Sequence, residues 1–313
     1  MGRRMEKTIV CRVLTGPTAC GKTEASLALA EKHGWEIACM DSMQIYRGMD
    51  IGTAKPSPEE RRRVKHHLLD IRDPREGFSV SLYREAAEAL IREKWQREGK
   101  ELLFVGGTGL YLQALMHPME MGAAPADPDF RKEMWALADS PGGPERIHAL
   151  LRKADPETAD RLPVGDIRRS IRALEVHRAT GIPFSRQPQR QEETGFRWRV
   201  AALDLPREIL YARINRRVEQ MVARGLRTEV KGLLDAGVSP ESQSMQAIGY
   251  RQMICHLRGD WSLDKAVEEI QKDTRHYAKR QGTFLRREPA VRYVDGEAPD
   301  RMEQLESIFL SGG

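Results

Sequence analysis

The sequence has few cysteines, no long hydrophobic run and no internal repeat. Its four cysteines, Cys11, Cys20, Cys39 and Cys255, lie far apart and form no C-x-x-C pair, which argues against a zinc site or a disulfide framework. No apolar stretch approaches the ~20 residues that span a bilayer, so we expect no membrane contact. The charged N-terminus leads through a short apolar run into a glycine-rich loop, which is not a signal-peptide pattern. These absences favour a protein of the reducing cytoplasm.

Charge of neither sign dominates the chain. There are 51 Lys and Arg against 46 Asp and Glu over 313 residues, which gives a formal net charge of +5. So mild an excess identifies no partner by itself, and the distribution of charge along the chain carries more information than the sum. The length is sufficient for one large domain or two.

One stretch carries a specific signal for phosphate binding. It lies between an apolar run at 9–14 and a helical pattern from residue 25, which is the context of the G-x-x-x-x-G-K-[ST] phosphate cradle. Lys22 supplies a point charge, and Thr23 supplies a hydroxyl for Mg²⁺. We therefore predict a bound di- or triphosphate, with a nucleotide kinase or NTPase as the first hypothesis. The stretch consists of Gly16, Pro17, Thr18, Ala19, Cys20, Gly21, Lys22 and Thr23.

Two further apolar runs end in polar motifs. The run at 35–40 ends at Asp41, and the run at 102–105 ends at Gly106-Gly107-Thr108-Gly109. Because the carboxyl ends of parallel strands meet at one edge of a sheet, we expect Asp41 to lie beside the phosphate loop. The sequence thus predicts an α/β fold, a P-loop-type parallel sheet flanked by helices. A helix is expected over 79–100 with Gly99 as its stop, and 47–73 is expected to be a long surface excursion.

The middle of the chain differs in character. Prolines punctuate short helical patterns there, which indicates an inserted all-helical domain at 118–195 between core segments 1–117 and 196–313. Its stretch 161–190 has seven arginines against Asp166 and Glu175. Nucleic-acid contact and a solvated helical face are both open interpretations of this run.

The C-terminal third returns to the sheet. A strand is expected at 197–203, followed by a helix from Pro206 to Gln220 on which Arg213 and Arg217 share one face. A long basic helix is expected at 261–287, and a minor strand at 291–294 precedes a tail helix.

Several motifs together resemble the bacterial tRNA dimethylallyltransferase (tRNA isopentenyltransferase) family. They cover residues 8–290 in order and lie at 16–23, 41–56, 66–70, 105–111, 172–176, 246–251 and 278–281. The resemblance implies that the phosphate loop holds dimethylallyl diphosphate with Mg²⁺. The acceptor would be N6 of the adenosine immediately 3′ of the anticodon in the tRNA anticodon stem-loop, with pyrophosphate released.

The resemblance also implies roles for single residues. Asp41 matches the general base, Thr108 the threonine beside the reacting amine, and Arg217 the diphosphate-binding arginine. Gln44 matches the residue that reads the adenine edge. The expected tRNA contacts are Asp41, Ser42, Met43, Gln44, Thr108, Arg131, Gly165, Asp166, Ile167, Arg168, Arg169, Gln246, Ala247, Ile248, Gly249, Tyr250, Arg251, Arg275, Lys279 and Arg280.

One stretch departs from the family pattern. Where the family shows Asn-Asp-Pro-Gln-Arg, this chain has Gly165-Asp166-Ile167-Arg168-Arg169, so tRNA contact there must be made differently. An ATP-dependent kinase, a prenyltransferase acting on free adenine nucleotides and a non-catalytic RNA-binding NTPase are the alternative hypotheses. The absence of a coiled-coil seam favours a monomer.

Overall fold

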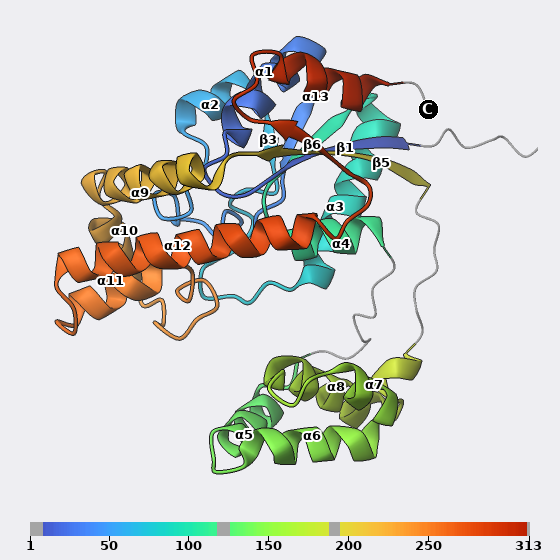
Figure 1. The fold of residues 1–313 in the computed structure, drawn as a ribbon, viewed down its shortest axis with the longest axis vertical. Helices are drawn as coiled ribbons and strands as arrows, with labels where there is room; N and C mark the ends of the chain where they lie inside the picture. The colour runs from blue at the N-terminus through green and yellow to red at the C-terminus, as the bar shows by residue number, and fades with distance from the viewer. Residues whose placement is uncertain (1–8, 118–125, 188–194, 312–313) are drawn as a thin grey trace, which may run out of the picture. The chain divides into compact units, whose positions relative to one another are not determined.

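The computed structural model describes residues 9–117, 126–187 and 195–311, and the chain forms two compact units. One unit comprises Met1–Met116 and Thr194–Gly313, and the other comprises His117–Glu193. Figure 1 shows an α/β unit and a separate helical unit built from the middle of the chain.

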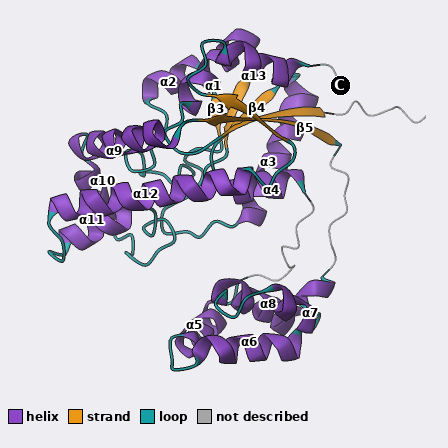
Figure 2. Ribbon diagram, in the orientation of Figure 1, coloured by secondary structure: helices purple, strands orange, loops and turns teal. Residues whose placement is uncertain are grey.

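The α/β unit is organised around a six-stranded sheet in the order β3-β2-β4-β1-β5-β6 (Figure 2). Every neighbouring pair in this sheet is parallel, which confirms the predicted fold class. The strands are β1 (Ile9–Thr15), β2 (Glu36–Cys39), β3 (His66–His67), β4 (Leu102–Val105), β5 (Phe196–Asp204) and β6 (Val291–Asp295).

Both faces of the sheet are buried, as parallel sheets require. Side chains alternate across each strand, so in β1 Val13 enters one core cluster while Leu14 enters the other. On the Val13 side, α3 (Val80–Glu93) and α4 (Gly109–Met116) supply the covering side chains. On the Leu14 side, α1 (Lys22–His33) and α13 (Arg301–Leu310) supply them.

The helix at 80–98 ends where the sequence indicates. Ser79 begins α3 by accepting a hydrogen bond from the Leu82 N–H. The last turn is a short π-helix, η1 (Lys94–Glu98), and Gly99 stops it with φ 62°, in the left-handed region that glycine tolerates.

The expected surface excursion at 47–73 holds for most of its length but not throughout. It contains α2 (Pro58–Arg63) and β3, and Met49 and Lys55 are both buried. The Lys55 ammonium donates to the Tyr46 carbonyl (2.8 Å) and to Asp50 and Asp70 (2.6 Å each). Lys55 can be buried in this polar segment because its charge is paired with two carboxylates.

Four helices lie between β5 and β6 in the chain. They are α9 (Arg207–Ala223), α10 (Leu226–Asp235), α11 (Tyr250–Leu257) and α12 (Leu263–Leu285). In Figure 1, α9 and α12 run side by side below the strand labels, and these two helices are in direct contact.

The helical unit has a small core of its own. It contains α5 (Pro128–Ala138), α6 (Gly143–Ala154), α7 (Pro156–Arg161), α8 (Ile167–Thr180) and the 3₁₀ turn η2 (Phe184–Arg186). Phe130, Ile147, Leu151 and Ile171 are among its buried residues. Arg190, the last arginine of the basic run, lies outside the described residues.

Candidate active site

A cavity of about 590 Å³ opens at the carboxyl ends of β1, β2 and β4. Phosphate-loop residues, strand-end residues and three arginines of α9 line it together. These residues include Thr18, Ala19, Gly21, Lys22, Thr23, Asp41, Gln44, Gly107, Arg213, Arg216, Arg217, Tyr277 and Gln281. The structure therefore brings Asp41 and Arg217 to the phosphate loop, as the sequence predicts.

The phosphate loop divides into residues that face the cavity and residues that shape the turn. Gly16, Pro17 and Cys20 are buried and do not line the cavity. Gly16 has φ 136°, and a Cβ there would lie 2.4 Å from the Leu203 carbonyl oxygen, so only glycine fits. The Lys22 ammonium donates to the carbonyl oxygens of Gly16 (2.9 Å) and Pro17 (2.7 Å).

Two long-range hydrogen bonds fix Thr18 at the rim of this loop. Arg217 Nη1 donates to the Thr18 hydroxyl (3.3 Å), and the Thr18 N–H donates to Gln281 Oε1 (2.9 Å). Burial lowers the pKa of Arg217, and the nearby Asp41 and Cys20 oppose that shift. Because arginine starts from a very high pKa, this half-buried side chain keeps its charge and gives the cavity a cation.

Asp41 lies in a turn that positions its carboxylate. Its Oδ1 accepts the N–H groups of Met43 (2.8 Å) and Gln44 (3.3 Å). The Ser42 N–H donates to the Thr108 hydroxyl (3.1 Å), so Thr108 holds the same turn from the end of β4. The carboxylate is therefore both a turn residue and a cavity residue.

A second cavity of about 350 Å³ adjoins the first. Asp41, Thr18, Thr53, Arg217 and Tyr277 line both cavities, which therefore meet at a boundary that includes Asp41. The walls that belong to the second cavity alone include Ser42, Met43, Gly52, Gln246, Ala247, Ile248, Gly249, Arg251, Thr274 and Arg280. One carboxylate thus stands between a phosphate-loop compartment and a compartment of different chemistry.

Gln44, the expected reader of the adenine edge, lines the first cavity and not the second. Its side-chain N–H group donates to the carbonyls of Thr53 (3.1 Å) and Ala54 (3.2 Å), and its Oε1 accepts from the Cys39 thiol (3.4 Å). In this structure its amide is therefore occupied in holding the 53–54 backbone.

Sequence reasoning assigned no role to two residues of α12, Tyr277 and Gln281. Gln281 Nε2 donates to the Gly107 carbonyl (2.8 Å), so this side chain links the β4 motif to Thr18. Burial raises the pKa of Tyr277 to about 12, and the charge of Asp41 adds to that rise. The sequence signal that could have found them is their spacing. Tyr277 and Gln281 are four residues apart on α12, and residues three and four apart share one face of a helix.

The glycines of the Gly106–Gly109 motif are explained by close packing. A Cβ on Gly106 would lie 2.0 Å from the Met40 carbonyl oxygen, and one on Gly107 would lie 2.1 Å from Gln281 Nε2. At Gly109 the clash would be with the Phe284 ring at 2.4 Å. The motif lets α12 and the end of β2 approach β4 closely.

The expected tRNA contacts of the α/β unit do not behave alike. Gln246, Ala247, Ile248, Gly249 and Arg251 line the second cavity, whereas Tyr250 is fully buried. The expectation that Tyr250 contacts tRNA directly is therefore wrong. Its ring packs inside the protein, and its hydroxyl donates to Glu229 (2.6 Å).

The basic residues of α12 also differ from one another. Arg275 donates to the Asn215 side-chain oxygen of α9 (2.7 Å), which engages it within the fold. Lys279 and Arg280 are exposed, and Arg280 reaches the wall of the second cavity. Of the three expected contacts on this helix, these two have accessible side chains.

In the helical unit, a buried carboxylate engages two of the arginines. Glu175 accepts hydrogen bonds from Arg131 (2.8 Å) and Arg172 (2.5 Å) and from the Asp127 N–H (2.7 Å). Burial alone would raise the pKa of Glu175, but these bonds outweigh it, so its pKa lies below the usual value. Arg131, an expected tRNA contact, thus has a structural partner.

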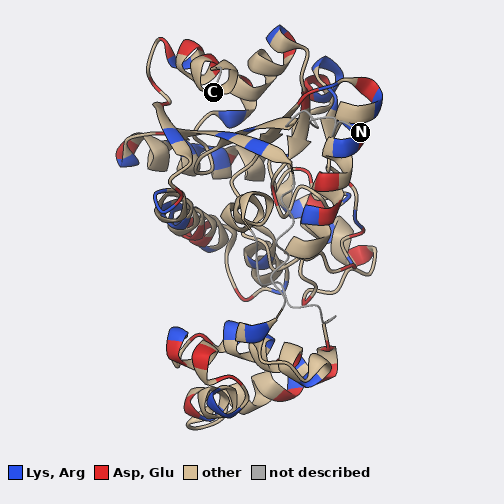
Figure 3. Cartoon of the chain, turned by 90° about the vertical axis from the view of Figure 1, so that its right-hand side faces the viewer, with Lys and Arg blue, Asp and Glu red and all other residues tan. Residues whose placement is uncertain are grey.

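The 165–169 stretch is accessible at the start of α8. Asp166 caps the helix by accepting from the Arg169 N–H, and Gly165, Arg168 and Arg169 are exposed, with Ile167 half-buried. Figure 3 shows basic and acidic residues interspersed on the helical unit. Arg169 Nη1 lies 3.4 Å from Asp166 Oδ2. The exposed arginines of this stretch are therefore Arg168 and Arg169.

The described residues contain no group of three or more His, Cys, Asp or Glu arranged to hold a metal ion. Thr23 lines the first cavity beside Lys22. A site that offers one hydroxyl and few carboxylates suits a Mg²⁺ ion whose other ligands are diphosphate oxygens and water. No helix within the described ranges is long and apolar enough to cross a membrane.

Comparison with known proteins identifies the family to which this arrangement belongs. The sequence model of the IPP transferase family matches residues 44–288. The chain belongs to the IPP transferase family. The tRNA dimethylallyltransferase of Geobacillus thermodenitrificans (strain NG80-2) is 44% identical over 299 residues, which cover 95% of this chain and 94% of that protein. The tRNA dimethylallyltransferase of Pelotomaculum thermopropionicum is 45% identical over 283 residues, with 90% and 89% covered.

Solved structures of this IPP transferase family are similar as well. The tRNA isopentenylpyrophosphate transferase of Bacillus halodurans matches with a TM-score of 0.69 and 41% identity over 97% of this chain and 95% of that one. A eukaryotic dimethylallyltransferase acting on tRNA matches with a TM-score of 0.76 and 27% identity, covering 96% of this chain and 76% of that one. The resemblance inferred from the motifs is confirmed.

Proposed function

We propose that this IPP transferase moves the dimethylallyl group of dimethylallyl diphosphate to N6 of the adenosine immediately 3′ of the anticodon in tRNA. The observation that carries the proposal is the junction of two cavities at Asp41. The first cavity offers a phosphate loop and arginines to a diphosphate, and the second offers apolar side chains such as Met43 and Ile248 together with Arg251 to a nucleobase. The names of the relatives support tRNA prenylation.

The chemistry assigned to these residues balances in one step. The adenine N6 forms a bond to the first carbon of the dimethylallyl group as the bond from that carbon to the diphosphate oxygen breaks. The N6 proton passes to the Asp41 carboxylate, since an aryl amine is a weak nucleophile that benefits from a general base. Lys22 and Arg217 stabilise the negative charge that develops on the departing pyrophosphate.

Mg²⁺ is proposed to accompany the diphosphate, with the Thr23 hydroxyl as its protein ligand. When bound, such an ion neutralises charge on the leaving group. The Lys22 ammonium and the loop N–H groups would bind the remaining oxygens.

The target base must leave its stack to reach Asp41, which costs a few kcal/mol that contacts to the flanking loop have to offset. An anticodon loop suits this requirement because its bases are partly unstacked. The exposed Arg168 and Arg169 of the helical unit are proposed to contact the tRNA backbone. A monomer and a cytoplasmic location stay predictions.

The proposal is tested with labelled substrates. The protein is incubated with Mg²⁺ and radiolabelled dimethylallyl diphosphate, together with either unmodified tRNA or AMP, and separately with γ-labelled ATP and the same acceptors. Label from dimethylallyl diphosphate in tRNA alone supports the proposal. Label in AMP, or transfer of the ATP γ-phosphate with no prenyl transfer, would replace it by one of the alternative hypotheses.

A further inference from the structure

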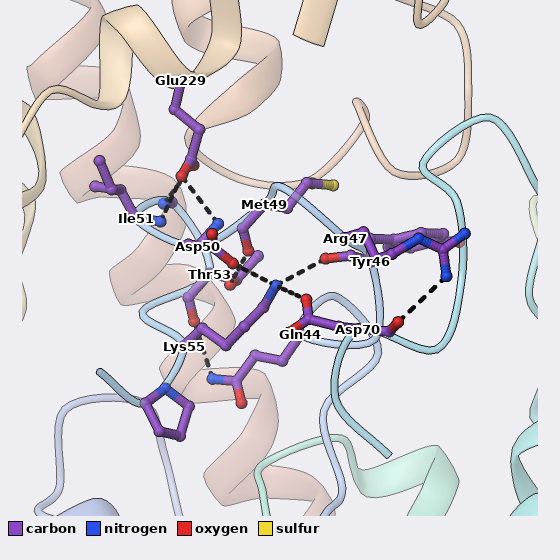
Figure 4. Close-up of polar contacts among 12 residues, drawn as sticks. Gln44, Tyr46, Arg47, Met49, Asp50, Ile51, Thr53, Lys55, Asp70 and Glu229 are labelled. Atoms are coloured by element: carbon purple, nitrogen blue, oxygen red, sulfur yellow. Dashed lines mark hydrogen bonds and ion pairs between the residues drawn. The ribbon is translucent and has the colours of Figure 1, made fainter. Parts of the chain in front are cut away.

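A carboxylate of α10 binds three consecutive backbone N–H groups far away in the sequence. Glu229 Oε2 accepts from the N–H groups of Asp50 (2.9 Å) and Ile51 (2.7 Å), and its Oε1 accepts from that of Gly52 (3.0 Å). Figure 4 shows Glu229 reaching the 50–53 turn from its helix. A turn whose donors all face one charge is held in a single conformation, because charge-assisted bonds are about twice as strong as neutral ones.

The same carboxylate also contacts the 246–251 segment, which supplies another part of the wall of the second cavity. The Tyr250 hydroxyl donates to Glu229 Oε1 (2.6 Å), and Tyr250 belongs to the 246–251 segment that lines this cavity. Burial raises the pKa of Tyr250, and the charge of Glu229 adds to that rise, so the hydroxyl stays a donor. Its ring packs so tightly on Gly52 that a Cβ there would lie 2.5 Å from it.

The turn held by Glu229 carries atoms that reach the reaction centre. Gly52 and Thr53 line the second cavity, and Thr53 also lines the first. The carbonyls of Thr53 and Ala54 hold the Gln44 amide. At the far end of the segment, the buried Lys55 holds Asp50 and Asp70, as Figure 4 also shows. The segment is thus fixed from both ends, and Glu229 is the fixing group that also contacts the 246–251 wall.

We infer that Glu229 is a positioning residue that sets the spacing between the 50–53 turn and the 246–251 segment, and so the shape of the nucleobase compartment. This inference rests on the proposed function, in which that compartment takes the tRNA acceptor. The residue does not line the first cavity, so the diphosphate side is expected to be insensitive to it.

The variant Glu229→Gln tests the inference with nearly unchanged volume. Glu229 accepts four hydrogen bonds, from the N–H groups of residues 50–52 and from the Tyr250 hydroxyl. A glutamine has one acceptor oxygen and one NH₂ donor group, so two of these four donors would face another donor or lose their partner. A displacement of about 1 Å in a substrate-positioning group can cost about 10²-fold in rate. We expect kcat/KM for tRNA to fall about 10-fold or more, with the KM for dimethylallyl diphosphate within about twofold of wild type.

Asp235→Asn is the matched control. It removes one negative charge from the same helix, at an exposed position that pairs with Lys231 in an i,i+4 arrangement. We expect its kinetics for both substrates to match wild type. Hydrogen exchange of the amides at 50–52 is the direct readout, and it should accelerate in Glu229→Gln but not in Asp235→Asn.

Tyr250→Phe is the second variant, because it leaves the three backbone bonds of Glu229 in place and is the milder change for folding. Like Glu229→Gln, it should lower kcat/KM for tRNA, but by a smaller factor. If folded Glu229→Gln keeps wild-type tRNA kinetics, or loses both substrates equally, the inference is overturned. If instead wild type prenylates no tRNA at all, the proposed function fails, whereas hydrogen exchange of the 50–52 amides still shows whether Glu229 holds that turn.

Discussion

Replacing Arg172 should destabilise the helical unit rather than weaken tRNA binding directly. Its Nη1 lies 2.5 Å from a Glu175 carboxylate of which 1% of the side chain is exposed. Removing one hydrogen bond to a buried charge costs about 1.5 to 3 kcal/mol. Glu175 keeps Arg131 and the Asp127 N–H, so the larger penalty of a wholly unpaired buried charge does not apply.

The size of the helical unit converts this cost into a temperature. For domains of roughly 60 to 100 residues, which includes the His117–Glu193 unit, 1 kcal/mol shifts the melting temperature by roughly 4 to 8 °C. Arg172→Ala should therefore lower the transition of this unit by roughly 6 to 24 °C. Differential scanning calorimetry of the full chain measures it, and Glu175→Gln should lower the same transition.

The double variant Arg168→Ala/Arg169→Ala should behave in the opposite way. Both side chains are exposed, so we expect little change in melting. Each lost phosphate contact reduces the dependence of log affinity on log salt by about 0.7, so two contacts reduce the slope by about 1.4. The ratio of wild-type to variant affinity for an anticodon stem-loop should then shrink about sevenfold between 50 and 200 mM salt.

The two variants together decide the role of the basic run. Arg172→Ala should keep the wild-type salt slope at a temperature where its helical unit is folded. A flattened slope with unchanged melting in Arg172→Ala would refute the reasoning, because it would make Arg172 a phosphate contact. An unchanged slope in the double variant would make Arg168 and Arg169 part of a solvated face.

Three further predictions concern the site and the pH dependence of stability. Asp41→Asn should keep tRNA affinity and lower the single-turnover rate by about 10²-fold or more, and a rate within a few-fold of wild type would contradict the general-base role. Lys22→Ala and Thr23→Ala should raise the KM for dimethylallyl diphosphate and leave tRNA affinity unchanged, as measured by steady-state kinetics and filter binding; a selective loss of tRNA affinity would reassign the loop. Burial alone would raise the pKa of Asp155, but bonds from Thr158 and Ser185 hold it at about 2, below its usual 3.8. The folded-state pKa is the lower one, so this stabilisation, about 2 kcal/mol, is present above pH 4 and is lost as pH falls toward 2. Asp155→Asn should therefore flatten acid unfolding of the helical unit in this window, and an unchanged acid transition would argue against the assignment.

Local patterns in the sequence determined the phosphate loop and most of the sheet. The apolar runs at 9–14, 35–40 and 102–105 are short, lie next to glycine-rich or acidic motifs, and each forms a strand. The rule that parallel strands end at one edge then placed Asp41 beside Lys22. Helix ends followed from Ser79 and Gly99, because capping is a property of neighbouring residues.

The tertiary structure alone decided which polar residues face the cavities and which support them. The Thr18 N–H donates to Gln281, and the N–H groups of the 50–52 turn donate to Glu229. In each case the two partners are more than 170 residues apart in the sequence. The burial of Tyr250 and the pairing of Arg172 with Glu175 likewise depend on which elements pack together. Periodicity in the sequence shows which face of a helix is apolar. It does not show which charged residues become paired, because a charge needs a partner only when folding removes it from water. That partner comes from whichever distant element packs against it.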